Sequence, residues 1–112
     1  MSLRLFLIST FLLLTSLSFA QDEVRIPNII TPNGDQVNDV FSIRTSGFET
    51  LTCTIFNRYG EPVYRFFGLN GNWDGRTHAG IKVSAGNYFV LVELERGDGT
   101  VETRQGSLQI QY

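Results

Sequence analysis

Turn-forming residues divide this chain into short segments from Val24 onward, and this division constrains its fold more than any other feature. Glycine, asparagine, aspartate or proline recurs at intervals of about ten residues, as in domains built from short strands. No stretch between them carries apolar residues at i, i+3, i+4 and i+7 over three turns, as an amphipathic helix would. The sequence therefore predicts an all-β domain.

The segments between the turns have the composition of β-strands. In several of them apolar and polar residues alternate, which is typical of a strand with one buried face. Gly60 and Gly97 lie in tight turns that favour hairpins. We expect strands over residues 24–30, 40–44, 51–57, 62–67, 88–95 and 101–112, and one or two short strands within 68–87.

Particular residues refine these expectations. Pro27 cannot donate a hydrogen bond to a ladder, so it favours an edge strand for the first segment. Gly106 suggests a bulge in the last strand, where Leu108, Ile110 and Tyr112 share one face.

The number and spacing of the strands favour one architecture. About seven strands without helices indicate an immunoglobulin-like antiparallel β-sandwich. Tyr88 follows a glycine turn at the start of a late strand, so it is a candidate for the corner tyrosine of such sandwiches. A partly open barrel is the alternative fold.

The first 20 residues have the order of a signal peptide. Arg4 precedes an apolar run over residues 5–14, and Ser18-Phe19-Ala20 forms a small-residue exit. Serine and threonine interrupt the apolar stretch, which is shorter than the roughly 20 residues that a membrane-spanning helix needs. We therefore expect cleavage after Ala20, a domain over residues 21–112, and no membrane span after cleavage. Gln21 is not a cysteine, so an acyl anchor at that position is excluded.

Charge and cysteine content exclude several classes of partner and one source of stability. Removing Arg4 changes the formal net charge from −2 to −3, and the remaining cations are scattered singly. Nucleic-acid and anionic-membrane binding usually require clustered basic residues, so we expect neither. Cys53 is the only cysteine, so no intrachain disulfide can form and stability must come from packing.

Few residues could carry out catalysis. His78 is the only histidine, and no motif supplies the partners of a catalytic triad. Cys53 lies among alternating apolar residues, where a free thiol behaves as a small hydrophobic side chain. Arg96-Gly97-Asp98 spells an adhesion tripeptide, but these residues also suit a hairpin turn. We therefore expect that the protein is not an enzyme.

The sequence TPNGDQVND places four oxygen-bearing side chains close together: Asn33, Asp35, Asn38 and Asp39. Calcium binds six to eight such oxygens in flexible geometry, so these residues are a candidate calcium site. Their spacing is not that of an EF-hand. The alternative is that the side chains cap the turn by hydrogen bonds to its own backbone.

Trp73 is the only tryptophan, and two roles are open to it. Its ring could cover one end of the core while its N–H finds a hydrogen-bond partner. Alternatively, Trp73 is a binding residue that stacks on a ligand.

Four runs of sequence together resemble a known family: IPNIITPNGDQVNDVFSI (26–43), CTIFNRYGEPVY (53–64), NWDGRTHAGIKVSAGNYFVLVEL (72–94) and the closing GSLQI. They are similar to the gliding motility-associated C-terminal domain, the type B sorting domain of exported Bacteroidetes proteins. The resemblance implies a β-sandwich that the type IX secretion machinery recognises. It also implies that an attached cargo crosses the outer membrane and stays on the cell surface or is released.

Two functions follow as hypotheses. The first is a non-catalytic sorting and surface-display module, linked to gliding or adhesion, that is exported through the periplasm to the cell surface or the extracellular space. Its partners would be the type IX secretion machinery or other cell-surface proteins. The alternative is a small β-sandwich that binds a carbohydrate or a protein through exposed aromatic residues. Family domains usually end long proteins, so we expect either a stand-alone domain or a truncated remnant of a larger gene.

Overall fold

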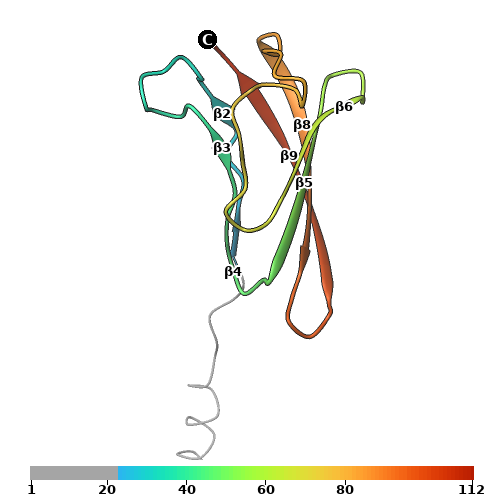
Figure 1. The fold of residues 1–112 in the computed structure, drawn as a ribbon. Helices are drawn as coiled ribbons and strands as arrows, with labels where there is room; N and C mark the ends of the chain where they lie inside the picture. Colours follow the sequence, from blue (N-terminus) through green and yellow to red (C-terminus); the bar gives the residue numbers. More distant parts are fainter. Residues whose placement is uncertain (1–22) are drawn as a thin grey trace, which may run out of the picture.

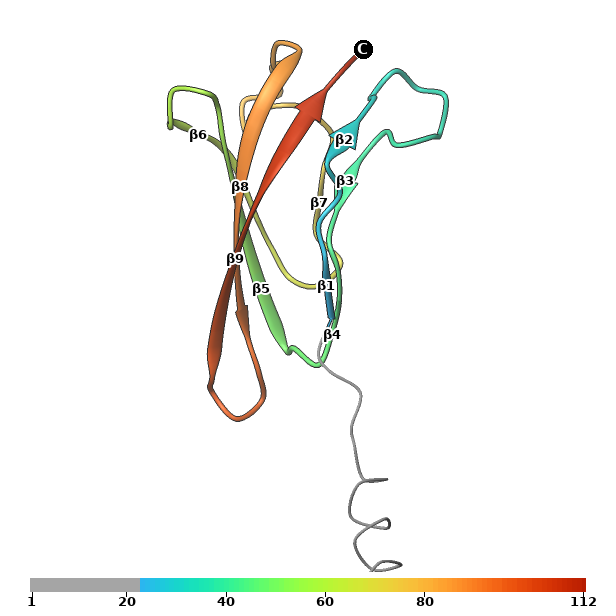
Figure 2. The same ribbon diagram turned by 180° about the vertical axis from the view of Figure 1, so that it is seen from behind.

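The computed structural model describes residues 23–112, which form an all-β sandwich and contain no helix. The predicted signal peptide and its boundary at residue 20 lie outside the described residues. Two layers of strands face one another (Figures 1 and 2). The strands are β1 (Glu23–Arg25), β2 (Ile29–Ile30), β3 (Phe41–Ser42), β4 (Arg44–Ser46), β5 (Thr50–Phe56), β6 (Pro62–Phe67), β7 (Asn72–Trp73), β8 (Gly86–Glu95) and β9 (Val101–Ile110).

One layer is a five-stranded sheet with the order β2-β9-β8-β5-β6. The pairs β5–β6, β5–β8 and β8–β9 are antiparallel, as expected. The predicted β-sandwich is confirmed, and one edge pair departs from the antiparallel arrangement, because β2 runs parallel to β9 and Ile29 lies opposite Gln109.

The other layer consists of two short antiparallel pairs, β1–β4 and β3–β7. The first predicted strand divides around Pro27, so β1 joins this layer while β2 joins the five-stranded sheet. The segment 40–44 likewise yields two strands, β3 and β4, on either side of Ile43. These two divisions explain why the described chain has nine strands where about seven were expected, since β7 falls in the segment 68–87, where a short strand was expected.

The core lies between the layers and uses alternate residues of the long strands, as the period-two pattern predicted. Tyr88 has the predicted role of a corner tyrosine, since its hydroxyl donates a hydrogen bond to the Ser84 carbonyl over 2.6 Å. The buried apolar side chains are Ile30, Phe41, Ile43, Phe48, Leu51, Cys53, Ile55, Phe66, Trp73, Tyr88, Val90, Val92, Leu94, Leu108 and Ile110.

Two expectations about the last strand were wrong. Gly106 forms no bulge, because it pairs in register with Val90. A Cβ atom at this position would lie 3.2 Å from methyl carbons of Ile26 and Val90, so the glycine lets the first segment cross close to β9. Tyr112 is 45 % exposed and does not join the core, and its hydroxyl donates instead to the carbonyl of Val83.

Candidate functional site

Three loops and the C-terminus meet at the end of the sandwich opposite the start of β1 (Figure 1). The loops comprise residues 31–40, 57–61 and 74–85, and we call this region the loop end. It presents large exposed apolar side chains, which are Val37, Val40, Tyr59, Ile81 and Tyr112. The loop end is therefore the part of the described chain where loop residues and exposed apolar side chains are concentrated.

Asp39 organises the loop of residues 31–40. One carboxylate oxygen accepts hydrogen bonds from the amides of Asn33 and Gly34, each over 3.2 Å. The other oxygen accepts from the Gln36 amide over 2.7 Å. Gln36 has a backbone φ of 65°, a left-handed conformation that residues other than glycine and asparagine seldom adopt. The carboxylate thus holds the loop in a conformation that its backbone would not favour alone.

The other three residues of the predicted cation site also act within the loop. The Asn33 side-chain oxygen accepts from the Asp35 amide over 3.2 Å, and Asp35 accepts from the Val37 amide over 2.9 Å. The Asn38 carbonyl accepts from the Thr31 amide over 2.7 Å. Turn capping by side chains is confirmed for Asn33, Asp35 and Asp39, whereas the bond of Asn38 comes from its backbone carbonyl. Residues 23–112 contain no group of three or more His, Cys, Asp or Glu side chains placed to hold a metal ion, and calcium binding stays a prediction.

We expect Asp39→Ala to destabilise the domain by about 1–2 kcal/mol, because three backbone amides lose their acceptor. The loss should be the same in calcium and in chelator, since the hydrogen bonds need no ion. Thermal melts of the wild type and the variant in both buffers measure it. If calcium raises the melting temperature of the wild type and Asp39→Ala abolishes the rise, the loop binds calcium as the sequence suggested.

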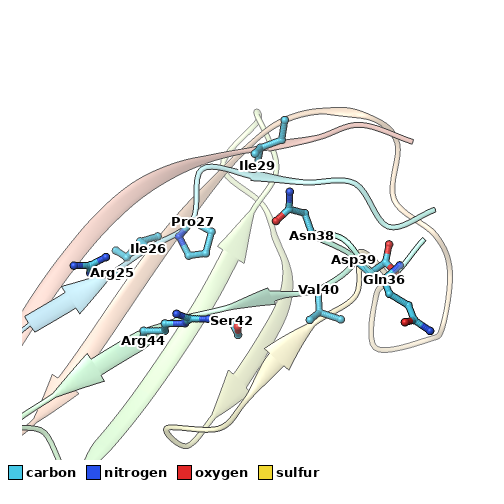
Figure 3. A pocket seen from close by; sticks show the side chains of 10 residues that line it. All are labelled: Arg25, Ile26, Pro27, Ile29, Gln36, Asn38, Asp39, Val40, Ser42 and Arg44. Atoms are coloured by element: carbon cyan, nitrogen blue, oxygen red, sulfur yellow. The ribbon is translucent and has the colours of Figure 1, made fainter. Parts of the chain in front are cut away.

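A groove of about 600 Å³ runs from this loop along the outer side of the smaller layer (Figure 3). Arg25 and Arg44 lie at one end of it, directly opposite each other on β1 and β4. Arg25 is ion-paired with Glu23. Gln36 and Asp39 lie at the other end, so the groove has cationic and acidic ends. The sequence did not indicate this groove, because Arg25 and Arg44 are far apart along the chain.

Trp73 lies in the core with 1 % of its surface exposed. Its indole N–H donates to the Arg76 carbonyl over 2.6 Å, and its ring packs against Tyr64 and Tyr88. The prediction that Trp73 covers the core is confirmed. A ligand-stacking role needs a ring face in solvent, and this arrangement leaves none.

His78 is exposed but has two definite contacts. Its ring stacks on Tyr64 with centroids 4.3 Å apart, and its Nε2 accepts a hydrogen bond from the Arg65 amide over 3.1 Å. Arg65 belongs to β6, an edge strand of the five-stranded sheet. His78 therefore caps part of that edge, a structural role that sequence analysis did not predict.

Cys53 is fully buried in the centre of β5. Burial raises the pKa of its thiol from 9.0 to about 12, because the thiolate would lose its hydration. A thiol that stays protonated at neutral pH is a poor nucleophile. Cys53 is thus a packing residue, as the alternating sequence suggested.

This raised pKa predicts that alkaline conditions destabilise the domain. Above about pH 9 the unfolded chain ionises its thiol while the folded chain does not, so the free energy of unfolding falls by up to ~1.4 kcal/mol per pH unit until about pH 12. Below about pH 9 both states keep the proton and this residue adds no pH dependence. Urea unfolding of the wild type and Cys53→Val at about pH 8 and pH 10 should give a smaller alkaline loss for the variant. Equal losses would contradict the prediction.

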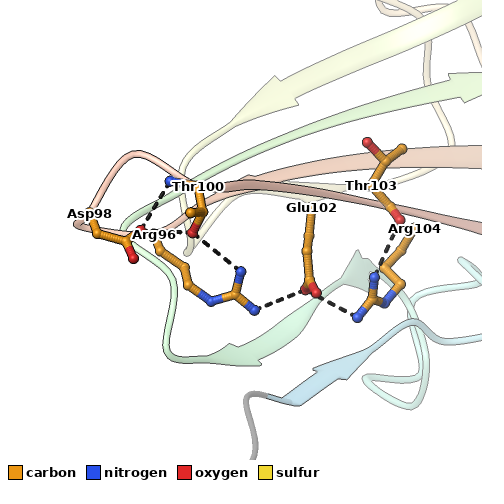
Figure 4. A network of polar contacts seen from close by, with 6 residues as sticks. All are labelled: Arg96, Asp98, Thr100, Glu102, Thr103 and Arg104. Atoms are coloured by element: carbon orange, nitrogen blue, oxygen red, sulfur yellow. Dashed lines mark hydrogen bonds and ion pairs between the residues drawn. The ribbon is translucent and has the colours of Figure 1, made fainter.

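The adhesion-like tripeptide is part of a polar network at the opposite end of the sandwich (Figure 4). The Arg96 guanidinium contacts the Glu102 carboxylate over 3.2 Å and lies over the ring of Phe48. Asp98 accepts hydrogen bonds from the backbone amide and the hydroxyl of Thr100. The hydrogen bond from the amide lowers the pKa of the Asp98 carboxyl below its ordinary value. These contacts support the hairpin-turn interpretation.

Comparison with protein families identifies the domain. The family model of the CHU_C type IX secretion signal domain matches residues 24–110, from β1 to the last residue of β9. The chain belongs to the CHU_C type IX secretion signal domain family. Membership implies export and interaction with the type IX secretion machinery, in agreement with the family resemblance in the sequence.

Solved structures show how this secretion signal domain is related in fold. CopC from Methylosinus trichosporium OB3b matches with a TM-score of 0.54 and 13 % identity, and the match covers 80 % of this chain and 89 % of CopC. At this identity the similarity concerns the fold alone. No curated protein matches the chain by sequence. Within residues 23–112, no helix has the length and apolar character needed to cross a membrane.

Proposed function

We propose that residues 23–112 act as a folded, non-catalytic sorting signal that the type IX secretion machinery reads as one unit. The observation that carries this proposal is the extent of the family match, which includes every strand of both layers. A linear tag would instead concentrate its recognised residues in a short terminal segment. The sorted protein would reach the cell surface or the medium after passing through the periplasm, and roles in gliding or adhesion would belong to the protein it carries or contacts.

The arrangement of the two ends supports this function. The described chain begins with β1 at one end of the sandwich and finishes at the loop end (Figure 2). A cargo joined ahead of Glu23 would therefore extend away from the loop end. The three loops and their exposed apolar side chains would stay accessible to the machinery.

A fusion tests the proposal directly. A fluorescent protein placed between Gln21 and Val24 should reach the surface or the medium in a host with type IX secretion. The same fusion in a strain that lacks the secretion machinery should stay in the periplasm. Retention in cells that demonstrably export another type IX cargo would refute the proposal.

The ligand-binding alternative depends on aromatic side chains gathered on one surface. Phe67 is 68 % exposed, but its neighbour Phe66 and Trp73 are buried. Tyr59 is exposed in the β5–β6 turn, away from Phe67 at the far end of β6. Tyr59, Phe66, Phe67 and Trp73 therefore form no shared exposed surface that would favour carbohydrate binding over sorting.

A further inference from the structure

The outer edge of β9 is open over half of its length. β9 pairs with β8 from Val101 to Ile110, but β2 pairs only with Gln109 and Ile110 on the other side. Within the described residues, no strand lies against residues 101–107 of this edge. Since β1 pairs with β4, it does not cover the opening.

The direction of the backbone groups along this edge follows from two hydrogen bonds. The Arg96 amide donates to the Thr100 carbonyl across the hairpin, so even-numbered residues of β9 direct their backbone groups toward β8. The Gln109 amide points the other way and donates to the Asn28 carbonyl. By the same alternation, Val101, Thr103 and Gln105 direct their N–H and C=O groups outward. These outward groups form a template for another strand.

The charged side chains beside this template select a particular strand. Glu102 and Arg104 lie on the same face of β9 and are ion-paired with each other over 3.1 Å (Figure 4). In an antiparallel pairing of two β9 strands centred on Thr103, Glu102 of each copy would lie opposite Arg104 of the other. Opposite charges stabilise such cross-strand pairs, and like charges destabilise them.

Neighbouring registers lack this complementarity. A register centred on Glu102 places two carboxylates opposite each other. A register centred on Arg104 places two guanidinium groups opposite each other. Charged side chains on an edge strand normally discourage pairing between sheet edges. Here they discourage the shifted registers and favour the one centred on Thr103.

We propose that two copies of this domain associate through β9, antiparallel and centred on Thr103, so that the two five-stranded sheets form one continuous sheet. In this register Val101 hydrogen-bonds with Gln105 of the second copy, and Thr103 pairs with its own counterpart. Because β9 begins at Val101, which lies opposite Gln105 in this register, the pairing spans residues 101–105 of each copy. The proposal is independent of the sorting function.

The first test measures association of the purified domain. One strand pair buries less than the roughly 1,200 Å² typical of stable interfaces, so we expect a dimer that dissociates at about 10 µM to 1 mM. Analytical ultracentrifugation over this range should show it. Thr103→Pro should weaken association at least about tenfold, because it removes an outward amide without breaking the β8–β9 ladder. Thr103→Val keeps the amide and should dimerise normally.

A second test addresses the register. Glu102→Arg or Arg104→Glu alone places like charges opposite each other and should weaken the dimer about tenfold. The double substitution restores opposite charges and should restore association. Hydrogen exchange at the Thr103 and Gln105 amides should slow as concentration rises. A monomer throughout the concentration range, or a dimer that Thr103→Pro leaves intact, would overturn the proposal.

Discussion

Val90→Asp is expected to abolish export of a cargo fused ahead of the domain. Val90 is 2 % exposed and lies in the middle of β8, between Ile55 on β5 and Gly106 on β9. A carboxylate there would be buried without a partner, at a cost above ~4 kcal/mol. Small domains have a total stability of ~5–15 kcal/mol, so most of the population would unfold or become marginally stable. If the secretion machinery reads the folded sandwich, sorting is lost with the fold.

The control introduces the same side chain on the opposite face. Gln109 is exposed on β9, so Gln109→Asp should leave both the fold and the export of the fusion unchanged. Circular dichroism melts of the purified domains and fluorescence of the medium and cell surface measure the two effects. Equal export of the Val90→Asp and wild-type fusions would show that folding is not required for sorting.

Trp73→Ala should destabilise the domain by about 3–5 kcal/mol. The indole is 1 % exposed and packs against Tyr64 and Tyr88, so its removal leaves a large cavity between the layers. It also removes the hydrogen bond to the Arg76 carbonyl that ties the loop of residues 74–85 to the core. Because His78 in that loop stacks on Tyr64, the cap on the β6 edge should loosen too.

Trp73→Phe distinguishes the contribution of the ring's volume to stability from that of the indole N–H. Phenylalanine fills most of the space but cannot donate to Arg76, so we expect a smaller loss of about 1–2 kcal/mol. Urea unfolding followed by circular dichroism at a fixed wavelength suits both variants, since neither retains a tryptophan for fluorescence. A loss below ~1 kcal/mol for Trp73→Ala would contradict the assignment of Trp73 as a central core residue.

The parts of the fold that local sequence determines were predictable. Alternating apolar residues marked β5 and β8, and glycine turns marked the hairpins that join β5 to β6 and β8 to β9. Tyr88 was recognisable because its hydrogen bond reaches only four residues back to Ser84. Nonlocal pairings were not predictable: no periodicity in residues 24–30 shows that the chain changes layers around Pro27, or that β2 runs parallel to β9.

The same distinction holds for the candidate sites. The capping role of Asp39 could be inferred because its partners lie within six residues. The groove between Arg25 and Arg44, the cap that His78 places on Arg65, and the open edge of β9 depend on contacts between distant segments. Gly106 shows the limit most clearly, because its sequence context suggested a bulge while its function is to admit Ile26.

The passage of the first segment from one layer to the other has a mechanical consequence. Tension applied to a preceding cargo enters at Glu23 and, when directed away from the loop end, acts along the axes of β1 and β2. The ladder hydrogen bonds of β1 with β4, and of β2 with β9, lie across this direction, so the load shears them together instead of opening them one by one. In a domain whose only cysteine is unpaired, these two short ladders resist extraction of the leading segment when a cargo is pulled.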